Sequence, residues 1–256
     1  MPHAAIIKPY RWLARYYDEI FASMRSPAGE ARERLLSRTL PRVNSACDLA
    51  CGTGTTALIL ARAGIKMYAV DLSPLMCRLA RKKAVRAGLP LRVLQADMRS
   101  FRLPEQVDLI TCEFDALNHV PRKGDLGKVA RAVARALHPG GHFFFDVNNS
   151  LGFKRYFTGA LWIEKPGVAL VMHSGHSLKA GRAWSDVEWF IRQGRLWRRY
   201  HERVEEVCWE AGEIRLTLKE AGFDRVRAWD AAPFFRDNPL IVPGCRTFWL
   251  ARKAGR

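Results

Sequence analysis

The segment from Asp48 to Thr55, with the sequence D-L-A-C-G-T-G-T, has the residue types of a ligand-binding turn. A short apolar run, 43–49, precedes it, and a helix-like segment follows it. The glycines let backbone N–H groups approach a ligand without a Cβ atom in the way, which is typical of nucleotide-binding strand–turn–helix units. Asp71 closes the next apolar run, where a carboxylate can bind two ribose hydroxyls.

Further features narrow the interpretation, because the glycine turn alone also fits the G-x-G-x-x-G/A fingerprint of dinucleotide-binding enzymes. Asp48 lies four residues before Gly52, Asp97 follows the third apolar run, and an L-H-P-G-G segment at 137–141 leads into a fifth run. With these features, residues 40–150 resemble the class I S-adenosylmethionine (SAM)-dependent methyltransferases. In that family D-x-x-C-G-T-G is the first motif, D-L-S carries the ribose acid and Q-A-D-M the adenine edge.

The resemblance implies SAM as the cofactor and assigns residues to its parts. Backbone in the glycine turn would face the methionine part, and Asp71 would bind the ribose. Asp97 and the amide of Met98 would suit the adenine edge, while Met76 would either pack on the adenine face or belong to the helix core. The predicted cofactor-binding residues are Asp48, Ala50, Gly52, Gly54, Asp71, Leu72, Met76, Asp97, Met98 and Glu113.

Three residues are predicted to act at the acceptor. Tyr17 lies in a Y-D-x-x-F segment that resembles the lid helix of small-molecule methyltransferases. His119 lies in a loop that resembles the one carrying a histidine near the acceptor amine in bacterial N-methyltransferases, and it can accept a proton at physiological pH. His201 lies in an alternating strand whose Trp197, Arg199 and Arg203 share its face, and we expect this face to roof the acceptor site. Each of these residues could instead be purely structural.

Five apolar runs alternate with helix-like segments, which predicts a parallel sheet covered by helices on both faces. The strands are expected at 43–50, 66–71, 91–95, 107–112 and 142–147, followed after a helix at 210–221 by 224–229 and 246–252. The predicted fold class is therefore α/β, a doubly wound, mostly parallel, seven-stranded Rossmann-like sheet. The strand order 3-2-1-4-5-7-6 is implied by the family resemblance.

Four segments of the chain differ in their predicted secondary structure. Residues 1–42 are predicted to be an N-terminal helical lid, with one helix over 8–25 and a second after Pro27. Residues 43–150 are the SAM-binding core, and 208–256 complete its sheet. Between them, 151–207 contain strand-like runs at 168–174, 183–192 and 196–207, which predict an inserted antiparallel cap.

Composition limits the class of protein. The chain has 256 residues and a net charge of +17, which favours anionic acceptors or nucleic acid over cationic acceptors. The apolar runs are too short to span a bilayer, and the start of the chain lacks a signal-peptide core, so we expect a cytoplasmic protein without a membrane partner. The six cysteines are scattered, so neither a disulfide framework nor a metal site is predicted.

The leading hypothesis is a SAM-dependent methyltransferase acting on nitrogen or oxygen of a small, possibly anionic molecule. An RNA or other nucleic-acid methyltransferase is the alternative that the positive charge supports, although the base-methylation motif D/N-P-P-[YFW] is missing after the fourth strand. A non-catalytic SAM-binding protein and an NAD-dependent oxidoreductase complete the alternatives. The oligomeric state is not predicted.

Overall fold

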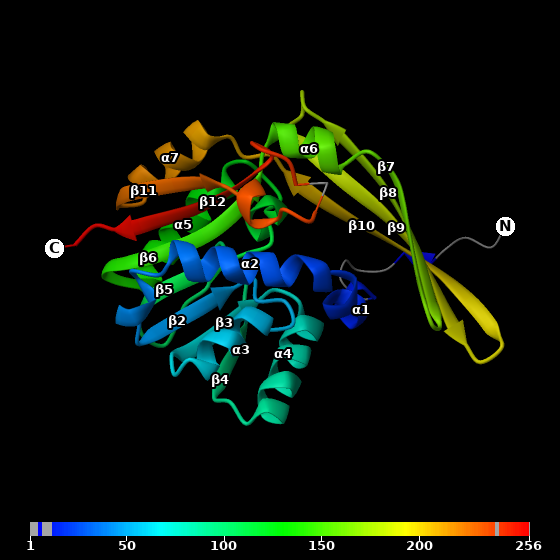
Figure 1. Cartoon of the computed structure of the whole chain (residues 1–256), viewed down its shortest axis with the longest axis horizontal. Helices are drawn as coiled ribbons and strands as arrows, with labels where there is room; N and C mark the ends of the chain where they lie inside the picture. The colour runs from blue at the N-terminus through cyan, green and yellow to red at the C-terminus, as the bar shows by residue number, and fades with distance from the viewer. Residues whose placement is uncertain (1–4, 7–11, 239–240, 256) are drawn as a thin grey trace.

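The computed structural model describes residues 5–6, 12–238 and 241–255. A seven-stranded sheet forms one body of the molecule, and a five-stranded sheet stands beside it (Figure 1). The strands of the first sheet are β2 (Ser45–Leu49), β3 (Lys66–Asp71), β4 (Leu91–Gln95), β5 (Val107–Cys112), β6 (Leu137–Asn148), β11 (Phe223–Asp230) and β12 (Arg246–Lys253).

The order of this sheet is β11-β12-β6-β5-β2-β3-β4. Numbered along the chain, the seven strands therefore follow the predicted order 3-2-1-4-5-7-6, read from the opposite edge. The pairs among β2 to β6 are parallel, and β12 pairs antiparallel with both β6 and β11. The predicted fold class is confirmed, and the carboxyl ends of the parallel strands meet at one edge, where ligands bind in open α/β sheets.

Helices cover both faces of the central sheet. One face packs against α5 and α7, and the other packs against α2, α3 and α4. The bounds are α2 (Ala22–Leu35), α3 (Thr55–Arg62), α4 (Pro74–Ala87), α5 (Asp125–Ala136) and α7 (Ala211–Glu220). Short 3-10 turns are η1 (Leu40–Arg42), η2 (Ala116–His119) and η3 (Ala232–Phe234).

Local sequence explains where α4 begins and ends. The hydroxyl of Ser73 accepts a hydrogen bond from the Met76 amide at 3.4 Å, and Pro74 occupies the first helical position, where its missing N–H costs nothing. Gly88 ends the helix with φ = +63°, a conformation that suits glycine.

The N-terminal helices differ from the prediction. Helix α1 spans Leu13–Ile20 and α2 follows after Phe21, so Pro27 lies inside α2 instead of preceding it. Ala28 and Ala31 of α2 are buried against the sheet, so tertiary packing outweighs the helix-breaking tendency of the proline. The first part of the helix predicted over 8–25, residues 8–11, lies outside the described residues.

The second sheet is the antiparallel cap. Its order is β1-β10-β9-β8-β7, with the strands β1 (Ala5–Ile6), β7 (Gly159–Lys165), β8 (Val168–Ser177), β9 (Arg182–Gln193) and β10 (Leu196–Val207). The three predicted strands are present. The sequence interpretation missed the edge strand β7, the parallel partner β1 and the short helix α6 (Ser150–Tyr156).

Helix α1 lies between the cap and the core, as Figure 1 shows. Trp12 and Leu13 are buried in one cluster with Trp189 of β9 and Leu170 of β8. None of the helices in the described part of the chain is both long and apolar enough to cross a membrane.

Candidate functional site

The glycine turn after β2 is built from residues in the left-handed region. Ala50, Gly52 and Gly54 have φ angles of +56°, +53° and +81°. A Cβ atom at Gly54 would lie 2.9 Å from the Cβ of Ala80 in α4, so only glycine lets the turn pack against that helix. The turn therefore delivers the start of α3 to the carboxyl edge of the sheet.

Asp48 lies beneath this turn and is 3% exposed. Its carboxylate accepts hydrogen bonds from the hydroxyl of Thr111 at 3.0 Å and from the amide of Ala57 at 3.2 Å. Burial, followed by the nearby charge of Glu113, raises the pKa of Asp48 to about 7. These two bonds and the burial of Asp48 support a role in fixing the turn to β5 and α3, and its direct contact with the cofactor stays a prediction.

Asp71 ends β3 and faces the turn. One carboxylate oxygen accepts the amide of Gly52 at 2.8 Å, and the other accepts the amide of Ser73 at 2.8 Å. Burial raises the pKa of Asp71, and these two bonds oppose the rise. The second lone pair of each oxygen remains available geometrically for a ribose diol, because a carboxylate offers about four acceptor positions.

The predicted adenine-edge residues lie at the next strand end. Arg99 binds both oxygens of the Asp97 carboxylate, at 2.6–3.1 Å, and also binds Asp125 at 3.0 Å. The hydrogen bonds from Arg99 lower the pKa of Asp97. Met98 is partly buried against the core. Arg99 was not expected from the sequence, and it holds Asp97 in its ionised, acceptor-only form.

The two remaining predicted cofactor contacts on this side differ in exposure. Leu72 is 64% exposed beside Asp71, whereas Met76 is 3% exposed. The placement of Leu72 suits contact with a ligand lying along the strand ends. The burial of Met76 favours the structural alternative stated above, a side chain in the helix core.

Glu113 follows β5 and is almost fully buried. Its carboxylate pairs with one guanidinium nitrogen of Arg32, at 2.8 and 3.1 Å, and lies 3.5 Å from the hydroxyl of Thr56. Burial raises the pKa of Glu113, and the charge of Arg32 opposes the rise. The pair joins α2 to the carboxyl end of β5, a link that the sequence did not reveal.

Tyr17 of α1 lies above the glycine turn. A Cβ atom at Gly52 would lie 3.9 Å from the tyrosine Cε1 atom. The next residue, Asp18, accepts a hydrogen bond from the hydroxyl of Thr53 and pairs with Lys83 of α4, whose amine also binds Thr53 at 2.7 Å. These contacts hold α1 against the turn and support the lid role that we expected for Tyr17.

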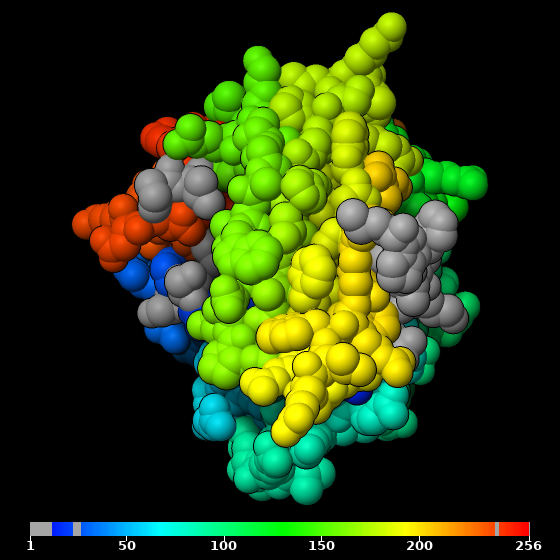
Figure 2. Space-filling view, turned by 90° about the vertical axis from the view of Figure 1, so that its right-hand side faces the viewer, coloured from blue at the N-terminus to red at the C-terminus, as the bar shows by residue number. Residues whose placement is uncertain are grey.

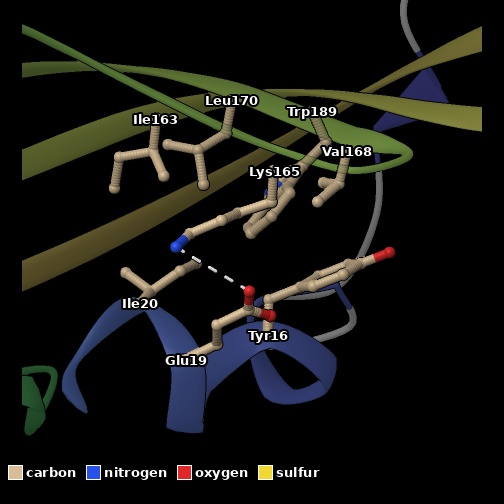
Figure 3. A pocket seen from close by; sticks show the side chains of 8 residues that line it. All are labelled: Tyr16, Glu19, Ile20, Ile163, Lys165, Val168, Leu170 and Trp189. Atoms are coloured by element: carbon tan, nitrogen blue, oxygen red, sulfur yellow. Dashed lines mark ion pairs between the residues drawn. The ribbon is translucent and has the colours of Figure 1, made fainter.

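The opposite side of α1 meets the cap through a narrow slot of about 10 Å³ (Figure 3). Tyr16 and Ile20 of α1 face Leu170 and Trp189 across it, and the amine of Lys165 lies 3.8 Å from the carboxylate of Glu19 at its mouth. The slot is too small for an acceptor molecule. Helix α1 therefore joins the cap to the glycine turn.

His119 ends the 3-10 turn after β5 and faces the base of β10. Its Nδ1 atom lies 3.3 Å from the carbonyl oxygen of Glu205, and its Nε2 atom lies 4.0 Å from a carboxylate oxygen of Glu206. Because a carbonyl only accepts hydrogen bonds, Nδ1 carries the proton and Nε2 carries the lone pair. Burial lowers the pKa of His119, which favours this neutral form.

A buried polar network that the sequence interpretation missed surrounds this histidine. Phe114 and Asp115 both have positive φ, and their amides donate to the two oxygens of Asp146, each at 2.8 Å. Arg246 of β12 pairs with Asp146 at 2.6 Å and with Asp115 at 3.3 Å. Asp115 and Asp146, like Asp71, are acids near the carboxyl end of a strand, so the same sequence pattern could have identified them. The sequence analysis predicted no metal site and did not bring Asp115, His119 and Glu206 together. Their side-chain ligand atoms lie within 4.8 Å of one another.

The expectation for His201 needs a correction. In β10 the inward side chains include those of Tyr200, whose ring is tilted against that of Trp12 with centroids 5.0 Å apart, and Glu202, which is 0% exposed. Because side chains alternate along a strand, His201 lies on the outer face, where its Nδ1 atom is 3.0 Å from Glu188. The expected roof face, which His201 shares with Trp197, Arg199 and Arg203, therefore points away from the core.

Figure 2 looks onto this outer face, with β7 to β10 across its centre. Trp162 and Trp197 line a shallow open hollow of about 260 Å³ there. Trp197, which we expected to roof an acceptor, is thus solvent-facing like Trp162, while Trp189 packs inward. On β10 the side chains that point toward the core are those of the opposite face.

The residues at this edge fit SAM on their own chemistry. Glycine-turn amides at the start of α3 and the exposed Leu72 border the Asp71 carboxylate, which retains acceptor positions for a diol. In this arrangement Asp71 would hold the ribose, and Asp97 would accept the adenine amino group. Tyr17 would close over the methionine part.

Comparisons with known proteins agree with this geometry. Residues 46–141 match the family model described as "Methyltransferase domain". YqeM of Bacillus subtilis (strain 168), whose name assigns it to the methyltransferases without naming an acceptor, is 27% identical over 247 residues, covering 96% of this chain and 97% of that protein.

Two solved structures share the fold over nearly the full chain. A SAM-dependent methyltransferase from Clostridium acetobutylicum ATCC 824 has a TM-score of 0.80 at 24% identity, covering 96% of this chain and 99% of its own. The sugar N-methyltransferase KedS8 from Streptoalloteichus sp ATCC 53650 has a TM-score of 0.74 at 22% identity, covering 93% and 92%. Taken with the motif residues at the strand ends, these matches support a SAM-dependent methyltransferase with the class I fold.

Proposed function

We propose that this methyltransferase methylates nitrogen or oxygen of a small-molecule acceptor, which binds between the carboxyl edge of the central sheet and the base of the cap. The observation that carries the proposal is the placement of His119, whose lone-pair nitrogen lies beside the buried carboxylate of Glu206. A neutral imidazole at this place can take a proton from an acceptor N–H or O–H group. One of the shared-fold proteins is named as a sugar N-methyltransferase, which agrees with a small acceptor.

Bound SAM supplies an electrophilic methyl group on a sulfonium, so the protein contributes chiefly position and proton removal. Asp71 and the glycine turn orient the cofactor. Tyr17 and α1 exclude water above the turn, since Asp18, Thr53 and Lys83 hold the helix there. His119 orients the acceptor and receives its proton.

The test is a measurement of S-adenosylhomocysteine release with paired panels of small amines, alcohols and carboxylic acids, and with purified total RNA. We expect turnover on members of the small-molecule panel. Turnover on RNA alone would contradict the proposal. A SAM-binding protein without turnover on either panel would be the non-catalytic alternative.

One observation favours RNA as a second candidate. Four basic residues, Arg78, Arg81, Lys82 and Arg86, are exposed on α4, the helix that packs against the glycine turn. If RNA were the acceptor, its affinity would fall steeply as salt rises, with a slope set by the number of phosphates contacted. Replacing two of these residues with glutamate would then reduce RNA methylation while small-molecule turnover stayed unchanged.

A further inference from the structure

We infer that the acceptor presents a protonated amine, which binds between Asp115, His119 and Glu206 and gives up its proton there. This inference rests on the proposed function and narrows it from nitrogen or oxygen to an amine. It differs from the anionic acceptor that net charge suggested, because the local charge at this site has the opposite sign.

Buried acceptor atoms without partners point to a ligand that donates hydrogen bonds. Glu206 is 5% exposed, and its Oε2 atom has no hydrogen-bond partner among the described residues. Asn148 is 2% exposed, and its Oδ1 atom also has none, while its amide nitrogen donates to Asp115 at 2.8 Å. A buried unpaired acceptor is costly, and only a donor or a cation satisfies one.

The local charge selects a cation. Asp115, Asp146 and Glu206 lie around one described cation, Arg246, and His119 is neutral. Arg246 pairs with the first two carboxylates and leaves Glu206 without an ion-pair partner of permanent charge among the described residues. Burial, followed by the nearby charge of Asp115, raises the pKa of Glu206 well above its usual range, while Asn148 and the charge of Arg246 oppose the rise.

The spacing of the three groups can be compared with that expected around an ammonium and around a metal ion. Their ligand atoms lie within 4.8 Å of one another, and the Nε2–Oε1 distance between His119 and Glu206 is 4.0 Å. An ammonium with tetrahedral hydrogen bonds of about 2.8 Å separates its acceptors by about 4.6 Å. Neighbouring ligands of zinc or magnesium, at about 2.1 Å from the ion, lie only about 3.0–3.4 Å apart. The 4.0 Å separation lies between these values, so the groups would move apart by about 0.6 Å around an ammonium and approach by about 0.6 Å or more around a metal ion.

The site also suits removal of the proton. A carboxylate with a raised pKa is a stronger base than an exposed one, so Glu206 can take the first proton from the ammonium while Asp115 and His119 accept its other two N–H groups. The N–H bond breaks, an O–H bond forms on Glu206, and the electron pair stays on nitrogen. The product is a neutral amine positioned as the nucleophile. His119 receives the second proton, which the methylated nitrogen loses after the transfer.

The experiment compares matched ligands by isothermal titration calorimetry, without SAM, in buffers of different ionisation enthalpy. The probes are glucosamine, glucose and N-acetylglucosamine, and the amine–alcohol pair hexylamine and 1-hexanol. We expect at least one amine to bind at least 10-fold more tightly than its uncharged partner. Its binding should release a proton, because the raised pKa lets Glu206 hold a proton where an exposed glutamate is ionised, and the cation displaces that proton.

Glu206→Gln is isosteric with the protonated side chain, so it should fold with an unchanged or higher Tm. It should weaken amine binding by about 30-fold or more and abolish the proton release. The matched control is Glu205→Gln, because the Glu205 side chain pairs outside the site with Arg203 and only its backbone carbonyl contacts His119. This variant should bind amines as the wild type does.

Three results would overturn the inference. The first is that amines bind no more tightly than their uncharged partners, which includes the case that no amine binds. The second is that Glu206→Gln binds amines as the wild type does. The third is stoichiometric binding of ZnCl2 or MnCl2 that Glu206→Gln removes. If alcohols prove to be methylated and bind as well as amines, the inference fails while the proposed function stands. If only RNA is methylated, the proposed function itself fails.

Discussion

Replacement of Arg32 tests how the carboxyl end of β5 is held. The Arg32 guanidinium, 2% exposed, binds both oxygens of Glu113 at 2.8 and 3.1 Å. Within the described part of the chain, this carboxylate also lies 3.5 Å from the Thr56 hydroxyl. Arg32→Met keeps the aliphatic volume but leaves the Glu113 charge buried and nearly unpartnered. Breaking one side of a buried ion pair costs about 3–5 kcal/mol. For a chain of this size, we expect Tm to fall by about 6–20 °C.

The double variant Arg32→Met, Glu113→Gln should recover most of that loss. The Nε and Nη2 atoms of Arg32 have no hydrogen-bond partner among the described residues, so the native pair is itself imperfectly satisfied. Replacing both members of such a pair is often neutral or stabilising. We therefore expect the double variant to match or exceed the stability of the wild type.

The destabilisation by Arg32→Met should depend on pH. Burial raises the folded-state pKa of Glu113 above its unfolded value of about 4.3, so the folded state binds the proton more tightly. The resulting stability is complete below about pH 4.3 and is lost as pH rises through the folded pKa. Loss of Arg32 raises that pKa further, so the stability difference between wild type and variant should be largest near pH 8 and should shrink toward pH 5.

The assay is urea unfolding at pH 5 and pH 8, followed by far-ultraviolet circular dichroism. Arg34→Met is the matched control, because it lies on the same helix with an exposed side chain 5.7 Å from the ring of Phe234. This contact is worth at most about 1 kcal/mol. Equal destabilisation by Arg32→Met at both pH values, or a double variant no more stable than Arg32→Met, would refute the reasoning.

Three further predictions concern the site. Asp71→Ala should weaken binding of SAM and S-adenosylhomocysteine by about 1–3 kcal/mol in calorimetry, and unchanged affinity would remove its proposed ribose role. His119→Ala should lower kcat by about 10²–10⁴ with SAM affinity retained, and should remove an acid limb that lies below the usual histidine range because burial lowers the pKa; full turnover would make the residue structural. Gly54→Ala and Gly64→Ala both place alanine at positive φ, +81° and +86°, but only the first brings a Cβ atom within 2.9 Å of Ala80. Gly54→Ala should therefore be more destabilising by about 1–3 kcal/mol in thermal unfolding, and equal Tm values would contradict the clash.

The sequence by itself determined the central sheet and its ligand edge. Strand-length apolar runs, each ended by an acid or a glycine, set the order of strands and helices, and local signals such as Ser73-Pro74 and Gly88 set where α4 begins and ends. The resemblance of the motifs to a known family implied the identity of the cofactor and the order of the last two strands. These features are readable because they depend on short-range backbone chemistry and on the fixed direction of parallel strands.

Other local signals were present and were overlooked. Pro166-Gly167 marks the turn between β7 and β8, and Asp115 and Asp146 stand at strand ends just as Asp71 does. Pro27 misled the interpretation, because the buried alanines of α2 stabilise a helix that the proline alone would interrupt.

Only the tertiary structure decided which side of β10 faces the core. Alternation gives two sets of side chains, and choosing between them requires knowing that Trp189 and α1 pack inside, since a shift by one residue exchanges the faces. The structure thus places Glu206, and not His201, on the face of β10 that points toward the core. Likewise, Asp48 and Glu113 have the right spacing for ligand contact, but their carboxylates are used by Ala57, Thr111 and Arg32. Residues up to 81 positions apart supply these partners, and spacing along the chain carries no record of such contacts.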